Sequence, residues 1–180
     1  MREMVVMGLD LSLTSTGLVV LSEGLMPKSK AIKSKENAER RLIDIKEQIE
    51  REILEYEPAL VVLEGYAMLA NGRITALAEL GGVVKASLYV RKQPFIVVPP
   101  ARVKKFATGK GNTTKDEVRL WVYKRWGVEL KTNDEIDAYV LAQIGLSYLG
   151  CPVQCKAQQE VIDDLLKAYP KRGDTCESAG

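Results

Sequence analysis

The stretch Val5-Val6-Met7-Gly8-Leu9-Asp10-Leu11 is an apolar run that carries a single carboxylate. A turn-like break at Thr16-Gly17 follows, and the aliphatic run from Leu18 to Leu21 resumes after it, so the pattern predicts a hairpin of two strands. An ionised Asp10 inside such a run would be partly desolvated, which is costly unless a cationic group lies near it. The stretch therefore predicts a buried strand that brings an acid into the interior of the fold.

Helices and strands are expected to alternate along the chain after this hairpin. Apolar residues at helical spacing predict an amphipathic helix from Asn37 to Glu55. The continuous apolar run from Ala59 to Leu63 is typical of a strand buried on both faces, and Glu64 stands at its end. The remaining signals are a helix at Ile74–Arg91, a short strand at Phe95–Val98 and, more weakly, a strand at Lys30–Lys33.

Two capping boxes mark later helices. Thr114 to Glu117 opens a helix that Gly127 closes, and Thr132 to Glu135 opens one that runs to Gly150. A last amphipathic piece, Val161 to Leu166, leads into a polar tail. The order of elements predicts an α/β fold with a mixed central sheet flanked by helices, in one domain over residues 1–150, followed by a C-terminal helix and polar tail over 151–180.

Composition narrows the class of protein. Apolar residues make up 46% of the chain and charged residues 28%, as in an ordinary soluble globular protein. No stretch approaches the roughly 18 apolar residues that span a bilayer, and the first residues do not resemble a signal peptide. We therefore expect a cytoplasmic protein with no membrane association.

The chain has few types of side chain that could serve as a catalytic nucleophile or base. The chain has no histidine, which excludes Ser-His-Asp triads, Cys-His dyads and histidine-ligated zinc. The three cysteines, Cys151, Cys155 and Cys176, follow the last strongly patterned segment, and their odd number argues against a disulfide framework. We interpret them as free thiols, so the chemistry must come from other groups.

The positive charge of the chain is concentrated in one segment of the sequence. The net charge is only +2, yet the segment from Arg102 to Arg125 holds eight basic residues against Asp116 and Glu117. Such a segment suits contacts with phosphates, although a run of charge is also typical of an ordinary solvated face.

Four acids form the candidate site: Asp10, Glu64, Asp134 and Asp137. Asp134 and Asp137 are three residues apart and share one face at the start of a helix. Singly, Asp10 could cap a turn, Glu64 could be a solvated strand end, and Asp134 could interact with its helix dipole. Together they favour oxygen ligands for one or two Mg²⁺ ions, with metal-activated water as the nucleophile.

Several segments of the sequence resemble the motifs of a known family. The stretch from Gly8 to Gly17 resembles the first-strand motif of the RNase H-like superfamily, with Glu64 in the place of its second acid. Asp134-Glu135-Ile136-Asp137-Ala138 resembles the closing motif of the RuvC-type Holliday-junction resolvases. The resemblance spans about residues 4 to 150, with all elements in the family's order.

The resemblance implies a structure-specific endodeoxyribonuclease that cuts branched DNA, especially four-way junctions, as a homodimer making paired nicks. It implies an RNase H-like fold and Mg²⁺ as cofactor, with two ions and with Mn²⁺ as a substitute. The segments 101–104 and 109–115 resemble the family's basic segment, in which two lysines approach DNA phosphates. Lys104 and Lys115 match that pair, and Lys105 could substitute. The expected basic DNA contacts are Arg102, Lys104, Lys105, Lys110 and Lys115.

Two positions depart from the family's pattern. Where the family often has an aromatic side chain three residues after the second acid, this chain has Ala67, flanked by Tyr66 and Met68, which are the candidates to disturb base stacking. The final motif carries Asp134 where some members have a histidine, and other members have aspartate there.

Other functions share parts of the pattern. The first-strand motif also resembles the phosphate loop of actin-like kinases and ATPases, but 180 residues cannot supply the two lobes which that arrangement needs. An RNA nuclease of the related YqgF type is disfavoured by the paired lysines and the Asp-x-x-Asp ending. A non-catalytic branched-DNA-binding module would have little reason to keep four partly buried acids together.

A dimer is expected because two matched cuts need two sets of carboxylates, and a two-fold axis would supply the second. Gly81 and Gly82 lie inside the helix expected from Ile74 to Arg91 and would let two backbones approach. On this interpretation the helix has more apolar side chains than one buried face requires, namely Leu77, Val84 and Leu88. The alternative is a Gly-Gly kink inside a monomer.

Overall fold

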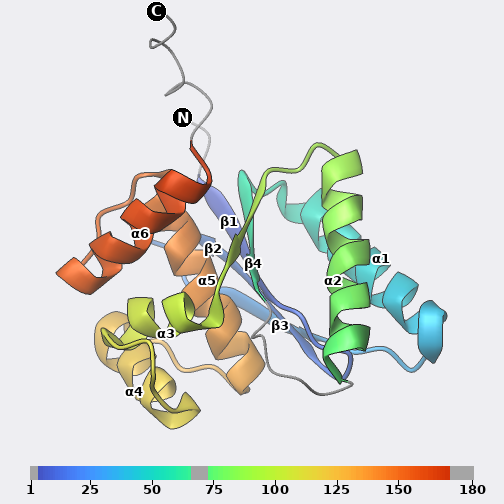
Figure 1. Ribbon diagram of the computed structural model, residues 1–180, viewed down its shortest axis with the longest axis horizontal. Helices are drawn as coiled ribbons and strands as arrows, with labels where there is room; N and C mark the ends of the chain where they lie inside the picture. The colour runs from blue at the N-terminus through green and yellow to red at the C-terminus, as the bar shows by residue number, and fades with distance from the viewer. Residues whose placement is uncertain (1–3, 66–72, 171–180) are drawn as a thin grey trace, which may run out of the picture.

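The computed structural model describes residues 4–65 and 73–170, and it has helices on both faces of one sheet (Figure 1). The sheet has five strands in the order β3-β2-β1-β4-β5. The strands are β1 (Val5–Asp10), β2 (Thr16–Ser22), β3 (Lys28–Ile32), β4 (Leu60–Glu64) and β5 (Phe95–Val98). The helices are α1 (Ala38–Tyr56), α2 (Arg73–Val90), α3 (Pro100–Thr108), α4 (Lys115–Trp126), α5 (Asn133–Leu149) and α6 (Lys156–Ala168).

The sheet is mixed, as the sequence predicts. β1, β2 and β3 pair antiparallel through the hairpin and its extension, whereas β1, β4 and β5 run parallel. Leu9 pairs with Leu63 in the parallel register, and Glu64 pairs with Val98. The parallel strands therefore end side by side, and this shared edge collects the residues that follow them.

Both faces of the sheet are covered, which is why its central strands are apolar without alternation. Even-numbered residues of β1, such as Val6, pack with α3, α4, α5 and α6, whereas Met7 and Leu9 pack with α1 and α2. Figure 1 shows α5 against one face of the sheet and the pair α1 and α2 against the other. The sheet thus separates two buried apolar clusters, and most side chains of its central strands are buried.

Capping residues set the starts of two helices on the α5 side. The side chains of Thr114 and Thr132 accept the backbone N–H of Glu117 and Glu135, whose carboxylates accept the threonine N–H groups in return. Both predicted capping boxes are thus confirmed, and Gly127 and Gly150 follow the two helices.

Two elements differ from the sequence-based expectation. The sequence analysis gives no helix after the strand Phe95–Val98, whereas α3 begins there at Pro100, and proline is favoured in a first helical turn. Helix α6 begins at Lys156, five residues before the predicted piece. Its buried residues join those of α3 and α5 in one cluster.

The interpretation of α2 as having apolar residues to spare is wrong. Val84 and Leu88 are each 1% exposed and Leu77 packs beside them, all against the sheet and α1. Gly81 is buried and lines a small cavity with Leu63 and Glu64, so it faces the core.

Among the described residues, Cys151 and Cys155 are free thiols, as predicted. No helix within 4–65 or 73–170 is long and apolar enough to cross a membrane.

Candidate active site

Asp10 and Glu64 lie next to each other at the shared edge of the parallel strands. Each is the last residue of its strand, and the pairing of Leu9 with Leu63 brings the two strand ends level. The two carboxyl groups are close enough for each to influence the pKa of the other. The sequence thus correctly predicts that two strands carry acids to one place.

Helix α5 brings the other two acids to this edge, and two glycines make the approach possible. A Cβ atom on Gly17 would lie 2.1 Å from the Asp134 carbonyl oxygen, and one on Gly8 would lie 2.0 Å from the carbonyl oxygen of Ala138. Any larger residue at either position would push α5 off the sheet. The glycines therefore set how closely Asp134 and Asp137 approach Asp10.

The acids perturb one another strongly. Burial, followed by the negative charges of Glu64 and Asp137, raises the pKa of Asp10 to about 9. Burial and the charge of Asp137 raise the pKa of Glu64 to about 7. Burial also raises the pKa of Asp137, with Asp134 adding to the effect. Like charges held together out of water favour binding of a cation.

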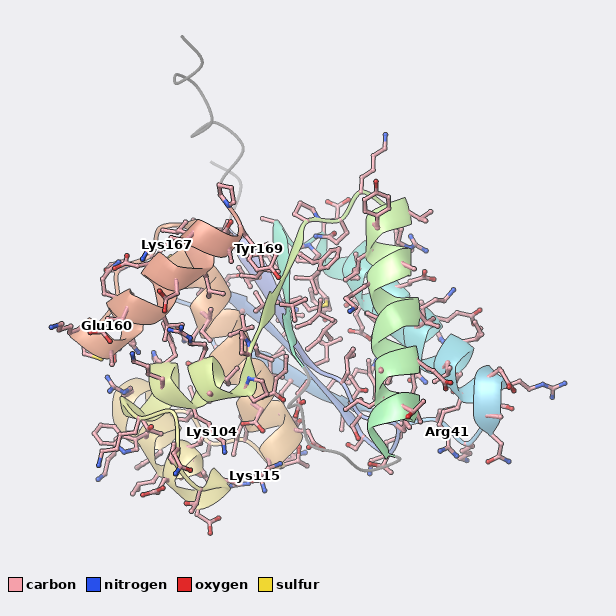
Figure 2. All side chains as sticks on the ribbon, in the orientation of Figure 1. Arg41, Lys104, Lys115, Glu160, Lys167 and Tyr169 are labelled. Atoms are coloured by element: carbon pink, nitrogen blue, oxygen red, sulfur yellow. The ribbon has the colours of Figure 1, made fainter. Side chains whose placement is uncertain are left out.

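Two lysines partly offset this repulsion. Lys115 Nζ lies 4.0 Å from Asp137 Oδ2, and the charges of Lys115 and Lys104 act to lower the pKa of both Glu64 and Asp137. Figure 2 shows Lys104 on α3 and Lys115 at the start of α4. The two lysines matched to the family's pair thus flank the acids from two different helices.

The acids fit a hard divalent cation by donor type and charge, because Mg²⁺ prefers carboxylate oxygens. The described side chains do not form a ready coordination sphere, since no group of three or more acidic or cysteine residues among them could hold a metal ion as it stands. The fit therefore rests on the oxygen donors and on the repulsion that a cation would relieve.

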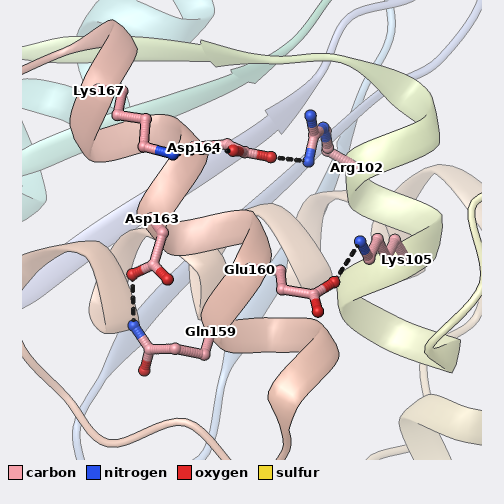
Figure 3. Close-up of polar contacts among 7 residues, drawn as sticks. All are labelled: Arg102, Lys105, Gln159, Glu160, Asp163, Asp164 and Lys167. Atoms are coloured by element: carbon pink, nitrogen blue, oxygen red, sulfur yellow. Dashed lines mark hydrogen bonds and ion pairs between the residues drawn. The ribbon is translucent and has the colours of Figure 1, made fainter.

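The other predicted DNA contacts have different surroundings. Lys110 is exposed in the loop after α3. Arg102 and Lys105 instead form ion pairs with Asp164 and Glu160 of α6 (Figure 3). Tyr66 and Met68 lie outside the described residues.

Sequence reasoning missed the residues that support the acids. Thr16 is fully buried, and its hydroxyl donates to the Ser12 carbonyl while accepting the Ser12 backbone N–H. This closes the turn directly after Asp10. Gly8 and Gly17 were part of the quoted motif, and a glycine inside a strand is a known signal of close backbone approach.

The arrangement of sheet and helices, with α5 crossing the mixed sheet beside the acidic strand ends, is the RNase H-like fold. The family model for crossover junction endodeoxyribonuclease RuvC matches residues 6–144. The chain belongs to the RuvC family. Membership implies the use of divalent metal ions in general.

Individual relatives agree with this assignment. A crossover junction endodeoxyribonuclease RuvC of Rickettsia akari is 33% identical over 151 residues, covering 77% of this chain and 94% of the relative. One from Synechococcus sp. is 27% identical over 107 residues, covering 58% of this chain and 70% of the relative. The structure of T. thermophilus RuvC in complex with a Holliday junction substrate is similar in fold, with a TM-score of 0.64 and 23% identity over 77% of this chain and 90% of that one.

Proposed function

We propose that this chain is a crossover junction endodeoxyribonuclease that hydrolyses phosphodiester bonds in branched DNA, above all in four-way junctions. The observation that carries the proposal is the pairing of Asp10 with Glu64 at one sheet edge, with Asp137 close enough to raise the pKa of both. Family membership supplies the reaction class, and this cluster supplies the groups for it.

The proposed catalytic set is Asp10, Glu64, Asp134 and Asp137. Their oxygens would hold divalent ions, and we propose two Mg²⁺ ions, with Mn²⁺ able to replace them. Such ions, when bound, would activate water and stabilise charge on the phosphate. The protein's own part is to supply compensating negative charge in a partly buried place, where electrostatic interactions are strong.

The proposed DNA contacts surround this set. Lys104 and Lys115 carry positive charge beside the acids and would bind the phosphates that flank the cleaved bond. Lys110, exposed between the two helices, would extend this contact along the backbone. Tyr66 and Met68 follow Glu64 in the sequence, and we propose that they disturb base stacking at the junction.

The part of the chain that the structure describes carries one acidic cluster of this kind, so two matched cuts in a junction call for two chains. We propose a symmetric homodimer, because a two-fold axis places two equal sites on two equivalent strands.

The test is a cleavage assay with labelled four-way, three-way and linear DNA duplexes and a matched RNA substrate, with and without Mg²⁺. We expect Mg²⁺-dependent nicks in the four-way junction, far faster than in linear duplex or RNA. Equal cleavage of linear DNA would contradict the junction preference, and preferential cleavage of RNA would contradict the DNA substrate.

A further inference from the structure

Helix α3 presents basic side chains on two different flanks. Arg102 and Lys105 are three residues apart and so lie on one flank, whereas Lys104 lies on another. Val103, Phe106 and Ala107 form the buried face between them. The charge of Lys104 acts on Glu64 and Asp137, so its flank is the one directed at the acids.

Helix α6 covers the other flank. Lys105 Nζ lies 2.7 Å from Glu160 Oε2, and Arg102 Nη1 is bonded to Asp164 Oδ2. Figure 3 shows the two basic residues of α3 facing these two acids, one helical turn apart on α6. Neighbouring Asp163 accepts a hydrogen bond from Gln159 of its own helix instead.

Contacts beneath the ion pairs fix the same two helices. Gln158 is 1% exposed, and its Nε2 donates to the Phe106 carbonyl oxygen at 3.2 Å. Val161, Ile162 and Leu165 share a core cluster with the buried face of α3. Apolar contacts, a buried hydrogen bond and two ion pairs thus hold α3 and α6 against each other.

We propose that Glu160 and Asp164 are positioning residues for DNA cleavage, which hold α3 so that Lys104 faces the acidic site. Arg102 and Lys105 then pair with these two acids and do not contact phosphates. This inference rests on the proposed nuclease function. It also reassigns two of the basic residues that the sequence suggested as DNA contacts.

The size of the effects makes the proposal testable. The two ion pairs are partly exposed, and pairs near the surface contribute little to global stability, so their loss leaves the protein folded. Helix α3 has only nine residues and begins at a proline without a side-chain cap. Its buried face also packs on α4 and α5, so the ion pairs with α6 hold its outer flank and not the whole helix. A displacement of about 1 Å near the reacting atoms costs up to roughly 100-fold in rate.

The first experiment removes both acids in Glu160→Gln/Asp164→Asn, with Asp163→Asn as the matched control. We expect the double variant to cleave a four-way junction about tenfold more slowly with junction affinity unchanged. Hydrogen exchange of the α3 amides should be roughly fivefold faster than in the wild type, and the control should match the wild type. Faster cleavage by the double variant would overturn the proposal, because it would mean that the acids of α6 keep Arg102 and Lys105 from binding DNA. Unchanged hydrogen exchange of the α3 amides would overturn it as well.

The second experiment exchanges the charges. Lys105→Glu and Glu160→Lys should each slow cleavage, and the double variant should recover the wild-type rate and junction affinity, because the ion pair is restored in reverse. A double variant that binds the junction as weakly as Lys105→Glu alone would show that Lys105 contacts DNA and would overturn the proposal. A wild type that cuts no junction contradicts the proposed function, whereas the exchange measurement tests the role of α6 independently of cleavage.

Discussion

Asp10 is held in its place at a cost to the folded state. Burial and the neighbouring acids Glu64 and Asp137 oppose its ionisation and raise its pKa to about 9. A residue under such conditions is stabilised by a bound cation, so the same feature that weakens the free protein favours metal binding. The burial of Asp10 therefore links the stability of the folded chain to its capacity to bind a metal ion.

Removing any of three acids should separate cleavage from binding. Asp10→Asn, Glu64→Gln and Asp137→Asn each remove a negative charge from the cluster and no contact to phosphate. We expect cleavage of a four-way junction to fall by more than about 100-fold, since even groups that only support a metal ligand cost about 10–100-fold when removed. Junction binding, measured by gel shift with Ca²⁺, should stay within about twofold. A variant with wild-type cleavage would remove that residue from the proposed site.

The stability of the metal-free protein should depend on pH through the same acids. The pKa of Asp10 is about 9 and that of Glu64 about 7 in the folded chain, against 3.8 and 4.5 for the unperturbed groups. Between these limits the folded chain keeps protons that the unfolded chain has lost, so stability falls as pH rises.

We expect the free energy of unfolding in urea with EDTA to drop by at least about 1.4 kcal/mol between about pH 5 and pH 9, which is the free energy that corresponds to a shift of one pKa unit. Asp10→Asn should flatten this profile and raise stability at the upper end. A wild-type profile no steeper than that of the variant would contradict the strained state of the acids.

The two lysines beside the acids should affect cleavage and salt dependence together. Lys104→Ala and Lys115→Ala should each slow cleavage about tenfold or more, and each should reduce the slope of log affinity against log salt by roughly 1. Lys92→Asn is a suitable control, because Lys92 lies at the opposite end of the sheet with a positive φ of 56° that asparagine tolerates. Unchanged turnover and salt slope would make both lysines ordinary surface residues.

Among the elements, α5 decides the geometry of the site. It packs across β1 and β2 with its backbone close to theirs at Gly8 and Gly17, and at its far end Gly145 makes room for Val6 and Val62 side chains in the same way. Close packing of this kind leaves little freedom for the helix to shift. The positions of Asp134 and Asp137 are thus set by residues that carry no charge.

Gly17→Ala should therefore damage both stability and cleavage. The added Cβ would meet the Asp134 carbonyl oxygen at 2.1 Å, so α5 must move. We expect a loss of about 1–3 kcal/mol in the free energy of unfolding and slower cleavage at equal folded fraction. Gly111→Ala is the control, because its Cβ would lie 3.2 Å from the Ala101 carbonyl oxygen in a loop that can adjust. Equal stability of the two variants would contradict the close contact.

Local signals predicted most elements and the meeting of Asp10 and Glu64 at one sheet edge, because capping boxes, apolar periodicity and strand ends depend on residues that are neighbours in the sequence. The strand β5 and the helices opened by Thr114 and Thr132 were predicted at their observed starts. The partners of Arg102 and Lys105 could not be predicted, since they lie more than 50 residues away on α6 and only tertiary packing brings them together. The prediction that the apolar face of α2 lies at a dimer surface was wrong for the same reason, since periodicity identifies the apolar face of a helix but not the element that packs on it.

At the scale of the whole molecule, the outer face of α2 remains available to a second chain. Ala78, Gly82 and Ala86 are exposed and four residues apart, which places three small residues in one row on the helix. A Cβ on Gly82 would meet nothing within 4 Å, and Tyr89 is 80% exposed on the same face. The row lets another backbone approach closely, so it replaces Leu77, Val84 and Leu88, which pack towards the sheet and α1, as the candidate dimer surface.

Gly82→Leu should accordingly convert a dimer into a monomer without unfolding it. The added side chain projects outward from α2 into open space, so the folded chain tolerates it, whereas two facing leucines would hold the helices apart. We expect sedimentation to give a dimer for the wild type at micromolar concentration and a monomer for the variant. The variant should then make mostly single nicks in a four-way junction, because each subunit keeps its own acids but loses its partner. Asp163→Leu, an equally exposed change on α6, should stay dimeric and make paired cuts. A wild type that sediments as a monomer both alone and on junction DNA would refute the dimer.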